Sequence, residues 1–88
     1  MKRLVFDHLA FEDFCNWAIY DKKIFKRILE LLKSIQRTPY SGIGKPEMLK
    51  FNKSGFWSRR IDQEHRLVYK VDEHGNVLIA SCKGHYLD

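Results

Sequence analysis

The sequence predicts an α+β fold in which two N-terminal helices pack on a mostly antiparallel, twisted β-sheet. Three observations lead to this prediction. Apolar residues recur at helical spacing up to Arg37, and after residue 40 the pattern changes to the alternation typical of strands. Two alternating segments, residues 66–71 and 77–83, are separated by a Gly75-Asn76 pair typical of a hairpin turn. A chain of 88 residues has room for one core, so we expect a single domain over residues 1–88.

Each helix is predicted to begin after an aspartate. Residues 2–6 should form a short strand, after which the Asp7 carboxylate can accept hydrogen bonds from the free amides of a first helical turn. Asp21 can cap a second helix in the same way. The expected apolar face of the first helix consists of Phe11, Phe14, Cys15 and Ala18, and that of the second of Ile24, Ile28, Leu31, Leu32 and Ile35. Thr38-Pro39 should end the second helix, because proline disfavours a helical residue before it and lacks an amide N–H.

The second half of the chain is predicted to supply most of the sheet. Residues 45–51 are expected to form a short strand or an extended edge, and residues 56–62 alternate between an apolar and a polar side. The apolar side holds Trp57 and Ile61, and the polar side holds Ser58 and Arg60. With helices covering one face of the sheet, we expect the other face to be partly open and to carry the basic side chains.

The charge of the chain predicts an anionic partner. The net charge is +5 and the isoelectric point about 9.4, which fits nucleic acid, an acidic protein or a membrane surface. Residues 44–70 hold seven Lys/Arg against three Asp/Glu, so the basic excess is concentrated there. The start of the chain carries charges within its first dozen residues, which is unlike a signal peptide or a membrane span. We therefore expect a cytoplasmic protein.

The two cysteines, Cys15 and Cys82, have no spacing typical of a metal site. Both lie in apolar, periodic contexts, so we expect two buried free thiols in a reducing cytosol, with a single disulfide as the alternative. The four histidines also lack paired ligand spacing, and no nucleophile elbow or glycine-rich phosphate loop is present. The sequence therefore predicts neither a metal nor another cofactor.

Polar residues that a core does not explain fall in the three β-rich stretches: Lys45, Glu47, Lys50, Arg59, Arg60, His65, Arg66, Lys83, His85 and Tyr86. These residue types fit RNA cleavage without a metal, in which the 2′-hydroxyl attacks the neighbouring phosphorus. Such a reaction needs a base, an acid and cations that stabilise the phosphoryl oxygens. Glu47 can be the base and His85 the acid. Arg60 and Arg66 can supply the cations, because a guanidinium binds two phosphate oxygens at once.

Structural roles are the alternative for each of these residues. Glu47 could be a surface salt-bridge partner, and the arginines at 59, 60 and 66 could solvate one sheet face or bind phosphate without catalysis. His65 could contact RNA or only cap a strand, and His85 could be an exposed surface residue. Residue types alone thus favour RNA binding and leave RNA cleavage open.

A longer pattern adds to this interpretation. The stretch GKPEMLKFNKSGFWSRRIDQEHRLVYKV (residues 44–71), followed by IASCKGHY (79–86), resembles the YoeB branch of the RelE superfamily of toxin endoribonucleases. The likeness covers nearly the whole chain. It implies a helix pair against a twisted, largely antiparallel sheet, and a toxin that cleaves mRNA in the ribosomal A site. Met48 and Lys83 depart from the family pattern, and no catalytic role is carried onto Lys83.

The resemblance also implies roles for single residues and for partners. The family's catalytic residues fall on Glu47, Arg66, His85 and Tyr86. Lys50 and Arg60 match positions that contact substrate phosphates, and we add His65 to the substrate-binding set. Implied partners are mRNA on the ribosome, a cognate YefM-like antitoxin, a second copy of the chain and, for the toxin–antitoxin complex, operator DNA. The leading hypothesis is a ribosome-dependent mRNA endonuclease. The alternative is a non-catalytic module that blocks translation by occupying the ribosome or its RNA.

Overall fold

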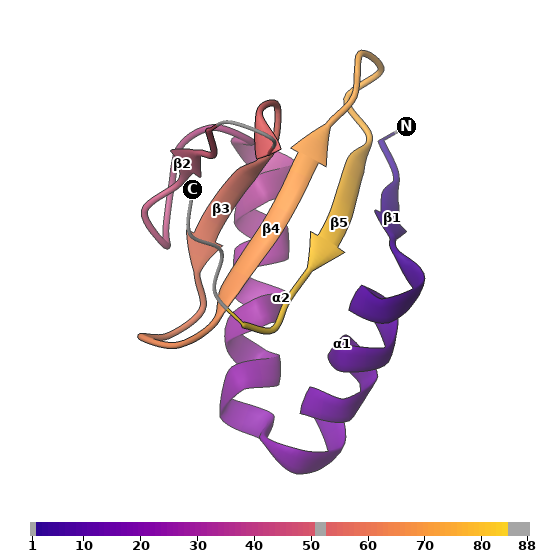
Figure 1. The fold of residues 1–88 in the computed structure, drawn as a ribbon, viewed down its shortest axis with the longest axis vertical. Helices are drawn as coiled ribbons and strands as arrows, with labels where there is room; N and C mark the ends of the chain where they lie inside the picture. Colours follow the sequence, from indigo (N-terminus) through magenta and orange to yellow (C-terminus); the bar gives the residue numbers. More distant parts are fainter. Residues whose placement is uncertain (1, 51–52, 85–88) are drawn as a thin grey trace.

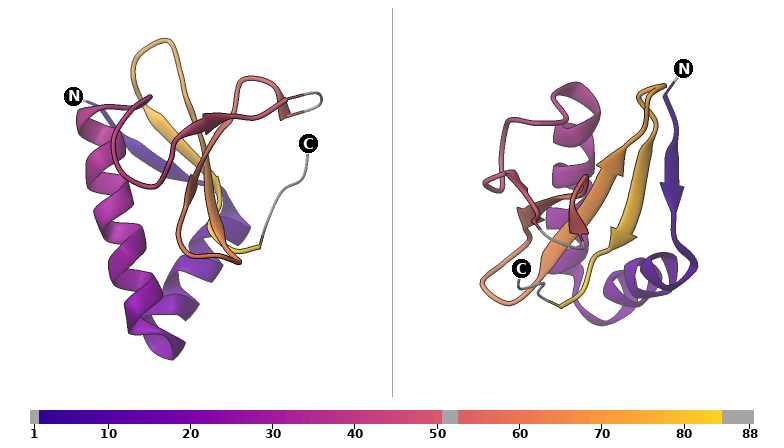
Figure 2. Two further views of the ribbon diagram at one scale, coloured as in Figure 1. Left: turned by 90° about the vertical axis from the view of Figure 1, so that its left-hand side faces the viewer. Right: turned by 45° about the horizontal axis from the view of Figure 1, so that its top comes forward.

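Two helices cover one face of a five-stranded sheet in the computed structural model, which describes residues 2–50 and 53–84 (Figures 1 and 2). The helices are α1 (His8–Tyr20) and α2 (Lys22–Arg37). The strands are β1 (Leu4–Phe6), β2 (Glu47–Met48), β3 (Trp57–Arg60), β4 (Arg66–Val71) and β5 (Val77–Ser81). Their order across the sheet is β1-β5-β4-β3-β2, and every neighbouring pair is antiparallel except β1 with β5. The predicted fold class is confirmed.

Both helices begin as predicted, at aspartate caps. The Asp7 carboxylate accepts from the backbone N–H of Leu9 at 3.2 Å, and that of Asp21 accepts from Ile24 at 3.3 Å. These bonds pair amide groups that the first helical turn leaves without partners. The helix α2 ends at Arg37, directly before Thr38-Pro39. Because Asp21 also ends α1, the two helices follow each other with a single residue between them.

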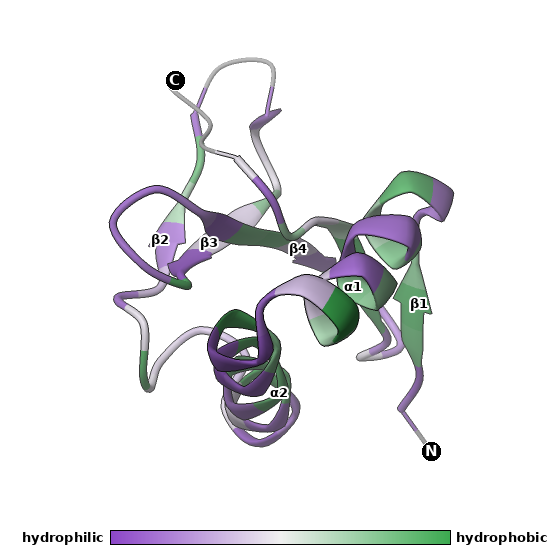
Figure 3. Cartoon of the chain, turned by 90° about the horizontal axis from the view of Figure 1, so that it is seen from below, coloured by the Kyte–Doolittle hydropathy of each residue, from purple (hydrophilic) through white to green (hydrophobic). Residues whose placement is uncertain are grey.

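The core lies between α2 and the sheet. Four of the five predicted α2 residues are buried, Ile28, Leu31, Leu32 and Ile35, and Ile24 packs against them. They meet Leu67 and Tyr69 of β4 and Val77 and Ile79 of β5. Figure 3 shows hydrophobic and hydrophilic residues on different sides of this helix. The predicted core face of α2 is therefore confirmed.

The predicted core face of α1 is partly wrong. Ala10 is the buried residue of this helix, and Phe14 and Trp17 pack against the core. Phe11 is 51% exposed and Cys15 is exposed, although both were expected on the inner face. The face that turns inward, towards α2 and β5, is thus rotated from the predicted one.

The strands form where alternation predicted them, with shorter limits in several cases. The first strand is β1, which lies within residues 2–6, and β4 has the predicted bounds. Within the described residues 45–50, the strand covers Glu47–Met48. It begins after Pro46, which has no N–H to donate to a neighbouring strand. The β4–β5 hairpin turns at Gly75-Asn76, where the Asp72 carboxylate accepts from the backbone N–H of Asn76 at 2.9 Å. Among the described residues, no helix is long and apolar enough to cross a membrane.

Candidate functional site

Glu47 begins β2 at one edge of the sheet, where its side chain is exposed. Three residues earlier, Gly44 adopts a φ of +84°, a region that other residues rarely occupy. The Gly44 carbonyl accepts a 2.7 Å hydrogen bond from the backbone N–H of Arg60, and a Cβ at Gly44 would lie 2.7 Å from Cδ2 of Leu31. The glycine therefore lets the loop pass close to α2 and join β3, which sets the position from which Glu47 enters the sheet.

Three charged side chains share the sheet face that points away from the helices. Glu47 lies opposite Ser58 in the β2–β3 pair, and Arg60 lies opposite Arg66 in the β3–β4 pair. Directly opposite residues of antiparallel strands point to the same face, and so do residues two apart in one strand. Ser58 and Arg60 are two apart, so Glu47, Arg60 and Arg66 lie on one face across three neighbouring strands. Arg59 points the other way and contacts α2.

The Arg60–Arg66 pair forms a site suited to an anion. Like charges directly opposite each other repel, and a phosphate bound between them would relieve that repulsion. Arg66 is oriented by a 3.2 Å hydrogen bond from its Nη1 to the Asp62 carbonyl oxygen. Both arginines line a surface depression of about 350 Å³, to which α2 contributes Arg27. Its remaining lining residues are Ile61, Asp62 and Gln63.

Arg27 is a residue that the sequence analysis did not single out. It is half-buried, whereas the neighbouring Lys22, Lys23 and Lys26 are exposed. The signal that could have found it is its place directly before Ile28, which puts it at the margin of the buried stripe of α2. A basic residue there faces the end of the sheet, where the two other arginines lie.

Arg59 does not lie on the open face, and the expectation that it solvates this face or binds phosphate is wrong. It is fully buried, and its guanidinium donates five hydrogen bonds. The acceptors are Tyr69 Oη at 3.2 Å, Ser34 Oγ at 2.7 Å, and the carbonyl oxygens of Ile43, Thr38 and Ser41 at 3.1, 2.7 and 2.7 Å. Because a guanidinium has five N–H donors, its hydrogen-bonding capacity is filled. Arg59 thus holds the loop between α2 and β2, which precedes Glu47, against the sheet.

The turn between β3 and β4 holds His65 and orients Arg66. The Asp62 carboxylate accepts backbone N–H bonds from Glu64 at 2.9 Å and from His65 at 2.7 Å. Burial is the largest single influence and raises the pKa of Asp62, but the two backbone hydrogen bonds and the nearby charge of Arg66 together hold that pKa below its usual value. The carboxylate therefore stays ionised and stabilises the turn directly before the Arg66 strand.

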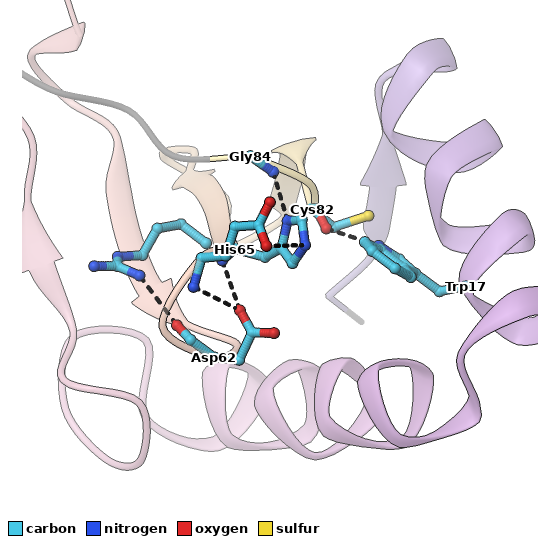
Figure 4. A network of polar contacts seen from close by, with 7 residues as sticks. Trp17, Asp62, His65, Cys82 and Gly84 are labelled. Atoms are coloured by element: carbon cyan, nitrogen blue, oxygen red, sulfur yellow. Dashed lines mark hydrogen bonds and ion pairs between the residues drawn. The ribbon is translucent and has the colours of Figure 1, made fainter.

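His65 itself is buried, with 8% of its surface exposed. Its Nδ1 accepts a 2.9 Å hydrogen bond from the backbone N–H of Gly84, and its ring lies edge-to-face on Trp17 (Figure 4). Little of the ring is accessible to RNA, so the expected contact of His65 with substrate has no support in its position and stays a prediction.

The family of this chain follows from comparison with known proteins. Residues 6–86 match the model of the YoeB-like toxin of bacterial type II toxin–antitoxin systems. The chain belongs to this family, within the RelE/ParE superfamily. Toxin YoeB of Escherichia coli K12 is 51% identical over 84 residues, which cover 96% of this chain and 99% of that one.

Solved structures of YoeB proteins have the same fold as this toxin. A YoeB–YefM complex from Staphylococcus aureus matches with a TM-score of 0.89 and 52% identity, covering 98% of this chain and 99% of the other. A YoeB dimer from the same organism has a TM-score of 0.89 and 53% identity, covering 97% and 98%. The predicted RelE-like architecture is thus confirmed.

The remaining predicted site residues of this YoeB-like toxin divide into two groups. Lys50 is exposed two residues after β2, on the segment that continues from Glu47. His85 and Tyr86 lie outside the described residues, so their expected roles stay predictions. Of the predicted set, the sheet brings together Glu47, Arg60 and Arg66, while His65 lies inside the molecule.

The cysteines of the toxin differ from each other, and the expectation that both are buried is wrong for one. Cys82 is fully buried, and its Sγ lies 3.4 Å from the Ala10 carbonyl oxygen. Burial, with a smaller effect of the Asp13 charge, raises the pKa of Cys82 to about 12. Cys15 is exposed, because α1 turns it away from the core. Both are free thiols, as expected.

Proposed function

We propose that this toxin is a ribosome-dependent endoribonuclease that cleaves mRNA in the ribosomal A site and so inhibits translation. The single observation that supports the proposal most is the placement of a carboxylate, Glu47, and two arginines, Arg60 and Arg66, on one open sheet face. Membership in the YoeB-like family supports the same function. We further propose that the toxin acts in the cytoplasm as one domain over residues 1–88.

The proposed reaction uses the RNA's own 2′-hydroxyl as the nucleophile and needs no metal. Glu47 takes the hydroxyl proton as general base, the 2′-oxygen bonds to phosphorus, and the bond from phosphorus to the 5′-oxygen breaks. His85 gives a proton to the leaving 5′-oxygen. The products are a 2′,3′-cyclic phosphate and a 5′-hydroxyl.

The other residues act on charge and binding. The guanidinium of Arg66 stabilises the negative charge that develops on the phosphoryl oxygens, and Tyr86 completes the proposed catalytic set. Arg60 and Lys50 bind the flanking phosphates. The ordering of Arg66 by the Asp62 carbonyl supports its role, because a positioned donor stabilises a transition state without first having to be reoriented.

Glu47→Gln and His85→Ala test the mechanism. Loss of a positioned base or acid costs about 10²–10⁴-fold in rate. We expect each variant to lose most cleavage of mRNA on purified ribosomes, mapped by primer extension, while it still folds and binds antitoxin. Glu73→Gln is the matched control, because Glu73 is exposed in the β4–β5 turn. Parental cleavage by both Glu47→Gln and His85→Ala would overturn the mechanism. Arrested translation with intact mRNA would favour the module that acts by occupancy.

The proposed partners follow from charge and from the family. A YefM-like antitoxin with an acidic segment fits the basic open face, because complementary charges speed association and select the partner. We also propose that the toxin forms a homodimer, as the YoeB of Staphylococcus aureus does. The complex of toxin and antitoxin is proposed to bind operator DNA. Co-purification with the antitoxin at several salt concentrations tests the first of these partners.

A further inference from the structure

Residues 82–84, which lead out of β5, make three backbone hydrogen bonds, one with α1 and two with the consecutive residues His65 and Arg66 at the start of β4. Figure 4 shows the bonds to Trp17 and to His65. Trp17 Nε1 of α1 donates to the Cys82 carbonyl oxygen at 2.9 Å. The Gly84 N–H donates to His65 Nδ1 at 2.9 Å, and the Gly84 carbonyl accepts from the backbone N–H of Arg66 at 2.9 Å. Both polar backbone groups of Gly84 are therefore paired, although no sheet ladder includes it.

The imidazole of His65 is held in place on several sides. Its ring packs on Trp17 with centroids 4.9 Å apart and an interplanar angle of 68°. Its backbone N–H donates to the Asp62 carboxylate at 2.7 Å, and its carbonyl accepts from Ile61 at 3.0 Å. A ring fixed in this way presents Nδ1 to Gly84 in one direction. Because Nδ1 accepts a hydrogen bond here, it carries no proton in this arrangement.

The position of Gly84 connects this contact to the open face. Gly84 is bonded to the backbone of Arg66, the residue whose guanidinium lies on that face opposite Arg60. His85 follows Gly84 directly in the sequence, so the hydrogen bonds of Gly84 fix the residue to which His85 is attached. Gly84 has a φ of +84°, so the direction in which the chain leaves this point depends on a conformation that glycine adopts readily.

We propose that His65 is a positioning residue for cleavage, which acts by holding Gly84, the residue that precedes the proposed general acid, beside Arg66. This inference rests on the proposed function, because it gives His65 a role through the proposed general acid. It replaces the expected direct contact of His65 with RNA by an indirect one. The geometry that carries it is the buried ring, its packing on Trp17 and the hydrogen bond to Gly84.

The first test compares His65→Phe with His65→Asn. Phenylalanine keeps an aromatic ring against Trp17 but has no acceptor, whereas the side-chain oxygen of asparagine falls where Nδ1 lies. We expect His65→Phe to lower the single-turnover cleavage rate constant by about 10- to 100-fold, the cost of misplacing a catalytic group by about 1 Å. The affinity for ribosomes carrying mRNA should not change. His65→Asn should recover a large part of the rate, and Glu73→Gln, a change at an exposed residue of the β4–β5 turn, should cleave as the parent does.

The second test asks whether His65 acts through His85. In the His85→Ala background, His65→Phe should cause no further loss, because the effect of positioning disappears with the group that is positioned. An equal loss in both backgrounds would overturn the proposal. So would a weaker affinity with an unchanged rate constant, which would make His65 a substrate-binding residue. If His85→Ala alone cleaves like the parent, His85 is not the general acid and the proposed mechanism is wrong. That result differs from an equal loss in both backgrounds and from a change in affinity, which contradict only the role of His65.

The free energy of unfolding of each variant, measured in urea, separates positioning from folding. If His65→Phe does not fold, His65→Gln takes its place with the same expected result, because its amide falls near Nε2 rather than Nδ1. A loss of rate that follows the loss of stability across all His65 variants, with no rescue by asparagine, would overturn the proposal.

Discussion

Arg59 Nη1 donates a 2.7 Å hydrogen bond to the Ser34 hydroxyl, which joins β3 to α2 inside the molecule. The same guanidinium binds the carbonyls of Thr38, Ile43 and Ser41, which belong to the segment between α2 and β2. One buried side chain thus connects the helix layer, the sheet and the loop that carries Glu47. The position of the proposed base depends on a contact made from the opposite face of the sheet.

Arg59→Lys is expected to destabilise the fold. An ammonium has three donors on one atom and cannot reach five acceptors spread around a planar guanidinium, so buried carbonyls lose their partners. We expect the free energy of unfolding, measured in urea by tryptophan fluorescence, to fall by about 2–4 kcal/mol. Arg60→Lys, a change at the exposed neighbour, should alter it by less than about 0.5 kcal/mol. Equal effects of the two substitutions would contradict the structural role of Arg59.

Gly44→Ala is expected to destabilise the loop before β2. The residue has a φ of +84°, and the added Cβ would lie 2.7 Å from Leu31 Cδ2, so strain and overlap add together. We expect a loss of about 1–3 kcal/mol in the free energy of unfolding. Gly55→Ala separates the two causes. Gly55 also has a positive φ, +94°, but the nearest atom to its added Cβ is Lys70 Cε at 3.8 Å. A smaller loss at Gly55 is the expected result.

Arg27→Gln tests whether the depression next to Arg60 and Arg66 binds phosphate. Removing one phosphate contact from a complex with single-stranded RNA should reduce the slope of log affinity against log salt by about 0.7. Affinity for an RNA oligonucleotide, measured at several salt concentrations, gives this slope. Lys26→Gln makes the same change in charge at the adjacent, exposed position and should leave the slope nearly unchanged. A larger effect at Lys26 would place the RNA elsewhere on α2.

The two thiols should react at very different rates. Cys15 is exposed, while burial raises the pKa of Cys82 to about 12, so almost no thiolate forms there near neutral pH. We expect a thiol reagent to label one cysteine per native chain and both in denaturant. A Cys15→Ser variant should be unlabelled until it unfolds. Because folding raises the pKa of Cys82, its contribution to stability is full below the ordinary thiol value of 9.0 and is lost as pH rises towards 12.

Asp62, in the turn between β3 and β4, should make the free energy of unfolding depend on pH in the acid range. Its pKa is lower in the folded chain than the usual value, so its contribution is present above about pH 4 and is lost as pH falls further. We expect the urea midpoint to fall more steeply below pH 4 in the parent than in Asp62→Asn, whose amide does not titrate. Asp72 in the β4–β5 turn also has a lowered pKa, so the difference between the two proteins is the quantity to compare. Identical pH profiles would exclude this role of Asp62.

The adjacent arginines 59 and 60 show how far sequence reasoning reaches. Alternation through residues 56–62 already places Arg59 on the same side as Trp57, facing the helices. Composition argues against that placement, because an arginine is seldom buried without a partner. The partners that make it favourable are mostly backbone carbonyls of a loop distant in sequence, and no residue pattern reveals their position. The side of the strand on which Arg59 lies was therefore predictable, and its burial was not.

The two helices also differ in how much the sequence could predict about their core faces. In α2, five apolar residues at regular spacing define a broad face, and packing follows it. In α1, the apolar residues surround most of the helix, so Phe11 and Cys15 matched a helical pattern equally well. Which side turns inward depends on the angle at which α1 crosses β1 and β5, a tertiary feature. Glu47 and Arg66 were predicted from motif and chemistry, whereas Arg27 required the fold to bring α2 beside them.

The parallel pairing of β1 with β5 has a consequence for synthesis. β1 is made first, yet its neighbour in the sheet, β5, is the last strand to be made, and β5 lies between it and β4. The sheet is incomplete until residues 77–81 have emerged from the ribosomal tunnel, because a strand cannot pair before its partner exists. The described sheet, with the face on which Glu47, Arg60 and Arg66 lie, is therefore completed only late in synthesis.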